Sequence, residues 1–144
     1  MLNQIVNDIK EYINEDNLFE NVMVKKAYDI PNKVKYPLIS VQEILNSENT
    51  QFSTREGEQV TNLTYQIDVL CGVTKLKNNT TLSAVDSSTL LANKVSKLLG
   101  GKNYKMVRVG QNVTQSYSAD NTIMRNIQRY ECCLDLRTNT IYRR

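Results

Sequence analysis

The clearest pattern of hydrophobic and polar positions lies between Tyr36 and Cys71. In its second half the apolar residues Leu63, Tyr65, Ile67, Val69 and Cys71 alternate with the polar residues Asn62, Thr64, Gln66 and Asp68. A period of two is typical of a strand with one buried face and one wet face. A less regular apolar run, which suggests a bulge, predicts the partner strand and consists of Leu38, Ile39, Val41, Ile44 and Leu45. We therefore expect one long hairpin, with its second strand at the centre of the sheet.

A polar segment joins these two strands. It extends from Asn46 to Glu58 and contains Phe52 as its only large apolar residue. Hairpin loops in compact domains usually have about 2 to 5 residues, so a polar insert of this length indicates either disorder or a function. The segment has little to bury, and we expect the fold not to depend on it.

Further elements are predicted on both sides of the hairpin. Apolar residues recur at helical spacing near the N-terminus and again in the middle of the chain. Ser83 or Asp86 can cap the second helix, and Gly100 and Gly101 end it. The expected elements are a helix from Leu2 to about Asn14–Asn17, a strand over Val22–Tyr28, the hairpin, a helix between Ser83 and Gly100, a strand over Tyr104–Val109, a loop over Gly110–Asn121 and a last strand over Ile123–Arg137.

This order predicts a single α+β domain over residues 1–144. We expect a mostly antiparallel sheet of about four to five strands, with two helices packed on one face. The last strand has one apolar side, formed by Tyr130, Cys132, Leu134 and Leu136. Its other side carries Arg125, Arg129, Glu131, Asp135 and Arg137, together with Ile127 and Cys133. The helix-free face of the sheet is therefore expected to be charged.

The composition argues against catalysis. The chain has no His, which excludes Ser-His and Cys-His nucleophile pairs and His metal ligands. Cys71, Cys132 and Cys133 lack the CxxC spacing of zinc sites and are expected to be reduced. No phosphate-binding glycine motif is present, since Gly100 and Gly101 are explained by the helix end. We expect no catalytic residue, no metal and no cofactor, and therefore a protein that is not an enzyme.

The charge is uneven along the chain. Residues 1–101 hold 10 basic and 12 acidic side chains, whereas residues 102–144 hold 8 basic and 3 acidic ones. A basic C-terminal third can face phosphate, an acidic partner or water. One alternative is therefore a small nucleic-acid-binding domain that uses Lys102, Lys105, Arg108, Arg125, Arg129, Arg143 and Arg144. No segment has the length and apolarity of a membrane span, and the N-terminus is unlike a signal peptide, so we expect an intracellular protein with no membrane contact.

Several short motifs in this order resemble one family. They are an acidic N-terminal helix, YPLISVQE followed by a polar loop, the strand TYQIDVLC, the capped helix SAVDSSTLLANKVSKLL closed by Gly, and the final strand IMRNIQRYECCLDL. Together they resemble the tail terminator, or tail completion, proteins of long-tailed bacteriophages and phage-tail-like particles. The resemblance covers almost the whole chain and rests on order and spacing rather than on any single motif.

The resemblance implies a structural virion protein that assembles in the bacterial host cytoplasm. It implies a homo-hexameric ring at the head-proximal end of the tail, which stops polymerisation of the tail tube protein and offers a surface to the head-tail connector or neck protein. The sheet is implied to face the lumen, where DNA passes, so that Arg125, Arg129, Glu131, Asp135 and Arg137 would be lumen-facing. A DNA conduit should avoid strong binding, so these arginines are expected to pair with Glu131, Asp135 or a neighbour's carboxylates.

Two surfaces are expected to contact a neighbouring subunit or the tube. They are the polar insert and the C-terminal tail at 138–144, with Asn49, Gln51, Phe52, Arg55, Glu56, Glu58, Ile141 and Tyr142 as the interface residues. The C-terminal tail is included because Ile141 and Tyr142 are apolar residues in an otherwise polar end of the chain. A head-tail connector or minor capsid protein of the neck remains the nearest alternative function.

Overall fold

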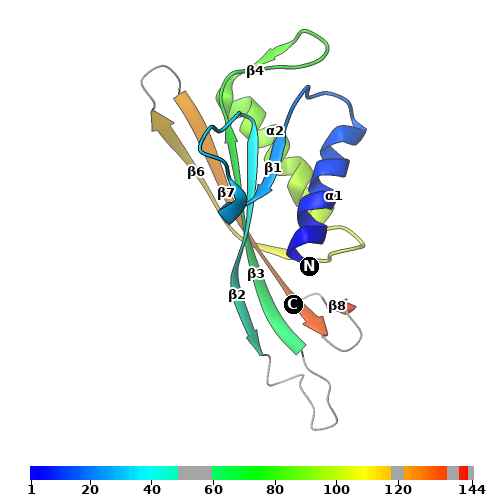
Figure 1. Cartoon of the computed structure of the whole chain (residues 1–144). Helices are drawn as coiled ribbons and strands as arrows, with labels where there is room; N and C mark the ends of the chain where they lie inside the picture. The colour runs from blue at the N-terminus through cyan, green and yellow to red at the C-terminus, as the bar shows by residue number, and fades with distance from the viewer. Residues whose placement is uncertain (49–59, 118–121, 136–139, 143–144) are drawn as a thin grey trace.

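Two helices cover one face of a mixed sheet in the computed structural model, which describes residues 1–48, 60–117, 122–135 and 140–142 (Figure 1). This is the α+β architecture that the sequence predicts. The helices are α1 (Leu2–Glu15) and α2 (Ala84–Leu99), with a short 3-10 turn, η1 (Ala27–Asp29). The strands are β1 (Met23–Lys26), β2 (Leu38–Glu48), β3 (Val60–Cys71), β4 (Thr74–Lys75), β5 (Thr81–Leu82), β6 (Val107–Tyr117), β7 (Thr122–Asp135) and β8 (Thr140–Tyr142).

The main sheet has the strand order β1-β2-β3-β7-β6, and β8 pairs with β7 beyond the start of β6. Strand β1 runs parallel to β2, whereas every other pairing in this sheet is antiparallel, so the sheet is mixed. The hydrophobic periodicity of a strand fixes its faces but not the direction of its neighbour, which is why the parallel pair was not predicted. Strands β4 and β5 form a separate two-stranded sheet.

The predicted pair of long strands is confirmed, and β3 lies at the centre of the sheet. A register shift between Glu43 and Leu45 of β2 accounts for the irregular alternation in the sequence. Asn46, Ser47 and Glu48, which we assigned to the polar insert, belong to β2. The rest of the insert lies outside the described residues.

Both helices begin and end close to the predicted positions. The α1 residues Ile5, Val6, Ile9 and Ile13 are buried, and α1 lies against β1 and β2. The first turn of α2 is capped by Ser83, whose side chain accepts a hydrogen bond of 3.1 Å from the backbone N–H of Asp86. Its buried residues Leu91, Ala92, Val95 and Leu99 pack on β3 and β7. The two helices also contact each other, so both lie on one side of the sheet (Figure 1).

The segment after α2 differs from the prediction. Tyr104 is fully buried but precedes the strand, and its Oη donates a hydrogen bond of 2.5 Å to Asp8 Oδ2 of α1. Strand β6 begins at Val107 and continues to Tyr117, so the predicted loop over Gly110–Asn121 is wrong over most of its length. Gly110 follows a register shift and marks a bulge rather than the end of the strand. Polar residues are tolerated in β6 because it is an edge strand.

The ends of three other predicted segments also shift. The first strand covers only Met23–Lys26, because η1 takes up the last residues of the predicted range. Strand β7 extends to Asp135, and the predicted continuation to Arg137 lies outside the described residues. Part of the predicted tail forms β8, in which Leu134 of β7 is the register partner of Ile141.

Candidate functional site

The helix-free face of the sheet carries most of the charged residues that the sequence places there. Strand register sets Gln66 of β3 beside Arg129 of β7, and Thr64 beside Glu131. Arg129 Nε donates to Gln66 Oε1 at 3.3 Å. The amide nitrogen of Gln66 in turn donates to Asp68 Oδ1 at 3.1 Å. The polar side chains of β3 and β7 therefore form one connected surface.

Arg125 is neutralised within the same subunit. Its Nη2 lies 2.5 Å from Asp68 Oδ2, and the Asp68 side chain retains only 14% of its exposure. The arginines were expected to pair with Glu131, Asp135 or a neighbour's carboxylates; for Arg125 the partner is Asp68 instead. This pairing lowers the positive potential that the face presents to solvent.

Two other residues of the predicted charged set are placed differently. Asp135 is buried, with 6% of its surface exposed, at the end of β7 where Thr140 of β8 is its register partner. Arg137 lies outside the described residues. Of the predicted charged set, Arg129 is exposed and Arg125 and Glu131 are half-buried in the described part of the chain.

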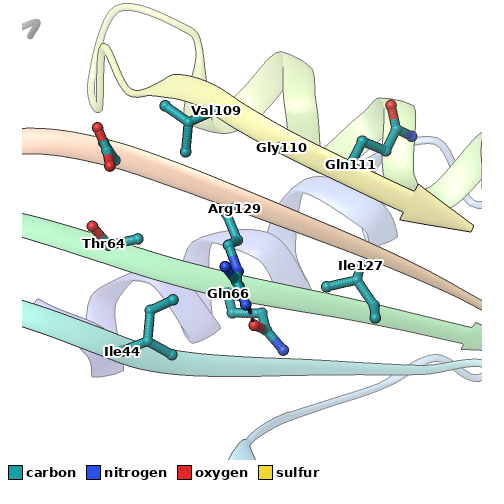
Figure 2. A pocket seen from close by; sticks show the side chains of 9 residues that line it. Ile44, Thr64, Gln66, Val109, Gly110, Gln111, Ile127 and Arg129 are labelled. Carbon is teal, nitrogen blue, oxygen red and sulfur yellow. Dashed lines mark hydrogen bonds between the residues drawn. The ribbon is translucent and has the colours of Figure 1, made fainter.

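A shallow groove of about 590 Å³ crosses this face (Figure 2). Its lining residues come from β2, β3, β6 and β7, and Figure 2 shows the helices behind the sheet. Ile44, Val109 and Ile127 supply its apolar side chains, and Arg129 and Glu131 supply its charges. The remaining lining residues are Thr64, Gln66, Gly110 and Gln111. Apolar side chains bordered by charges suit contact with another protein.

Both edges of the sheet are open over long stretches of the described chain. Strand β6 pairs with β7 on one side only, and its Val109 and Val113 are half exposed, at 50% and 52%. At the other edge, β1 covers β2 only from Leu38 to Val41, which leaves residues 42–48 of β2 paired on one side. Unpaired strand edges present backbone donors and acceptors to any strand that can add to them.

Strand β6 has few of the features that protect natural edges. It contains neither Pro nor Lys, and Arg108 is its only charged residue. Its bulge lies between Arg108 and Gly110, so residues 110–117 form a regular ladder with β7. Edge strands are commonly blunted by lysine, proline or a bulge along their length. Residues 110–117 are therefore well suited to pairing with another strand.

Two buried polar residues of β7 were missed in the sequence. Asn126 and Gln128 of β7 are 1% and 0% exposed, on the same side of the strand as Tyr130. Tyr130 Oη donates to Gln128 Oε1 at 2.5 Å, and Gln111 Nε2 donates to Asn126 Oδ1 at 3.3 Å. Asn126 and Gln128 are spaced by two from Tyr130 and so share its face of the strand, and this spacing was the sequence signal for their burial. Their polar side chains suggested solvent exposure instead. The Gln111–Asn126 bond links β6 to β7, whereas the Tyr130–Gln128 bond lies within β7.

The buried titratable groups act as structural contacts. Burial raises the pKa of Tyr65, and the nearby carboxylate of Glu43, which accepts a hydrogen bond of 3.0 Å from Tyr65 Oη, raises it further. Burial also raises the pKa of the Cys71 and Cys132 thiols to about 12. A thiol that stays protonated at neutral pH is a poor nucleophile and a poor metal ligand. These two cysteines therefore pack as core residues, as the sequence predicts.

The predicted interface residues are only partly located. Ile141 is half-buried and packs against the core, so β8 contributes to the fold of this subunit. Tyr142 is paired with Cys133 in the β7–β8 register. Asn49, Gln51, Phe52, Arg55, Glu56 and Glu58 lie outside the described residues.

No protein-family model matches the sequence, and no curated protein matches it. In the described part of the chain, no helix is long and apolar enough to cross a membrane. The same residues contain no group of three or more Cys, Asp or Glu side chains that could hold a metal ion. The helix-free face and the two sheet edges are the candidate functional surfaces of the described chain.

Proposed function

We propose that this chain is a structural subunit of a phage tail or tail-like particle that assembles into a ring, with six copies, on the head-proximal end of the tail tube. The ring ends polymerisation of the tube and forms the surface for the head connector. The proposal combines the family resemblance of the sequence with one observation on the structure: the sheet has two open edges whose strand directions are compatible with closing a ring.

The pairing of the strands sets the relative direction of the two open edges. Strands β2, β3, β7 and β6 alternate in direction, so β6 runs antiparallel to β2 of the same subunit. A second copy in the same orientation can therefore place residues 42–48 of its β2 beside β6 as an antiparallel pair. Such a head-to-tail contact uses two different surfaces, and it generates a ring when the rotation closes.

The helix-free face suits the lumen of such a ring. Its arginines have partners inside the subunit, Asp68 for Arg125 and Gln66 for Arg129. A surface of this kind is polar enough to be wet. The Asp68 carboxylate compensates the charge of Arg125, whereas Arg129 is exposed and bonded to a neutral amide, so it still presents its charge to DNA. The polar insert and Tyr142 then remain the proposed contacts with the tube or the neighbouring subunit, whereas Ile141 packs against the core of its own subunit. This role requires no catalytic group and no cofactor.

The nearest alternative is a head-tail connector or minor capsid protein of the neck. It would use the same edges and differ in the partner that the ring contacts. Specific nucleic-acid binding by the basic C-terminal third is less well supported, because Arg125 is already paired with Asp68.

The proposal is tested with tail tubes assembled from the tube protein of the same particle. Adding this chain should arrest tube growth and place a ring on one end in electron micrographs. A connector would leave tube length unchanged and bind the portal side of the neck instead. The double variant Val109→Lys/Val113→Lys places charges on the open edge and should abolish the ring while preserving the melting temperature.

A matched control separates the edge from general surface charge. Val73 and Val85 are also exposed, at 74% and 49%, but neither belongs to β6 or β2. The variant Val73→Lys/Val85→Lys adds the same charge and should still cap tubes. Equal loss of capping in both double variants would contradict a contact through β6.

A further inference from the structure

A short basic segment accounts for the entire net charge of the chain. Residues 25–36 contain Lys25, Lys26, Lys33 and Lys35 and a single carboxylate, Asp29. The rest of the sequence holds 14 basic and 14 acidic side chains. Outside this segment, residues 1–101 are strongly acidic, with 6 basic and 11 acidic side chains. The segment is therefore an isolated positive patch, separate from the basic C-terminal third.

Two tyrosines on the same segment are unusually exposed. Tyr28 keeps 75% of its surface accessible, and Tyr36 keeps 45%. Lys26 Nζ lies 5.6 Å from the centroid of the Tyr28 ring. Lys25, Lys33 and Lys35 are exposed, and in the described part of the chain no ion pair holds any of the four lysines. Charge and aromatic surface are thus both available to a ligand.

The segment is held in place at both of its ends. The backbone N–H of Met23 donates to Pro37 O at 3.0 Å, and Lys25 and Lys26 are fixed in β1 by pairing with β2. Ile30 and Val34 are partly buried between the exposed lysines and tyrosines. A segment whose ends are already fixed loses less conformational entropy when it binds a ligand.

The chemistry favours a single-stranded polyanion over a protein. Lysine is depleted at protein interfaces, whereas it is a standard contact for phosphate groups. Exposed aromatic rings stack on unpaired bases, and this stacking tolerates any sequence. A duplex offers the phosphates but hides the faces of its bases. The segment also lacks arginine, which is the usual reader of base edges.

We propose that residues 25–36 bind single-stranded nucleic acid without sequence preference. The four lysines contact backbone phosphates, and Tyr28 and Tyr36 stack on bases. The site is distinct from the groove of the helix-free face, and it does not depend on ring formation.

Fluorescence anisotropy with a labelled 20-nucleotide oligo-dT tests the proposal at several salt concentrations. The logarithm of the binding constant should fall with the logarithm of salt with a slope of about −0.7 per neutralised phosphate, and so about −2 to −3 for three or four lysines. Lys33→Gln/Lys35→Gln should reduce this slope by about 1.4. Tyr28→Ala should weaken binding by about 5- to 150-fold without changing the slope. A duplex of equal length should bind more weakly than oligo-dT.

The charge-matched control is Lys10→Gln/Lys102→Gln, which removes two exposed lysines elsewhere. It should leave the affinity and the slope unchanged. All of these side chains have exposed surface, so the variants should melt like the parent chain. Absence of binding at 20 mM salt, or equal loss in the control, would overturn the proposal. So would a Lys33→Gln/Lys35→Gln variant that loses self-association but keeps its oligo-dT affinity, since the segment would then contact the acidic surface of a second copy.

Discussion

The contact between Asp16 and Lys94 couples the end of α1 to the middle of α2. Asp16 is the C-cap of α1, and its carboxylate forms an ion pair with Lys94 Nζ. The Lys94 side chain is only 11% exposed, whereas that of Asp16 is 51% exposed. Burial lowers the pKa of Lys94 from its ordinary value of 10.5, and nearby Lys97 lowers it further. The folded protein therefore carries a costly buried cation that depends on one carboxylate.

The informative perturbation is Asp16→Asn, which keeps the shape of the side chain and removes its charge. Two unit charges about 4 Å apart attract by about 4 kcal/mol at an effective dielectric constant of 20 and by about 1 kcal/mol in water. Because Asp16 is half exposed, the value should lie toward the lower limit, and we expect a loss of about 1 to 2 kcal/mol. For a chain of this size that corresponds to a fall in Tm of about 3 to 7 °C.

A double-mutant cycle isolates the pair. In a Lys94→Met background the buried cation is absent, so Asp16→Asn should change the free energy of unfolding by less than about 0.5 kcal/mol. Glu15→Gln removes an exposed neighbouring carboxylate and serves as the control, with an expected effect within about 0.5 kcal/mol. Urea unfolding followed by circular dichroism measures all four corners of the cycle.

The pH dependence supplies a second test with a defined sign. Because the pKa of Lys94 is lower in the folded state, the unfolded state binds more protons between that lowered value and 10.5, and stability rises with pH in this window. The deficit caused by Asp16→Asn should therefore shrink as the pH approaches 10.5. An equal effect of Asp16→Asn in both backgrounds, or a deficit that does not change with pH, would refute the assignment.

Two further predictions concern the core. Burial raises the pKa of Cys71 and Cys132 to about 12, and Cys133 is also buried. Ellman's reagent at pH 8 should therefore detect no fast-reacting thiol in the native protein and three after denaturation. Rapid reaction of Cys71 or Cys132 in the native protein would contradict this burial. Leu91 is fully buried, so Leu91→Asp should cost several kcal/mol and prevent folding, whereas Thr89→Asp on the exposed side of α2 should melt normally. A cooperative melt for Leu91→Asp would mean that α2 does not pack on the sheet as described.

The sequence predicts the elements whose signals are local. Strand β3 alternates cleanly because one face is covered by helices, and α2 carries its cap at Ser83 and its stop at Gly100. The hydrophobic pattern therefore identifies the α+β class and the central strand. It does not identify β6, where Gly110 at a bulge and the polar residues of an edge strand imitate a loop.

The features that were missed depend on tertiary context. Asn126 and Gln128 are polar but buried. Their burial is tolerated because the hydrogen bond from Gln111 to Asn126 and the one from Tyr130 to Gln128 satisfy part of their polar groups. Arg125 pairs with Asp68 because of the register between β3 and β7, and this register cannot be deduced from the sequence. The basic segment at 25–36 is hidden when charge is summed over residues 1–101, because acidic residues elsewhere in that part of the chain outweigh it.

The most direct test of the proposed function is cryo-electron microscopy of tail tubes assembled with and without this chain. We expect a closed six-fold ring of density at one end of the tube, with β6 of each subunit beside residues 42–48 of β2 in the next and the helices on the outside. Tubes whose two ends are identical in the presence of the chain, or a ring whose subunits touch only through their helices, would contradict the account.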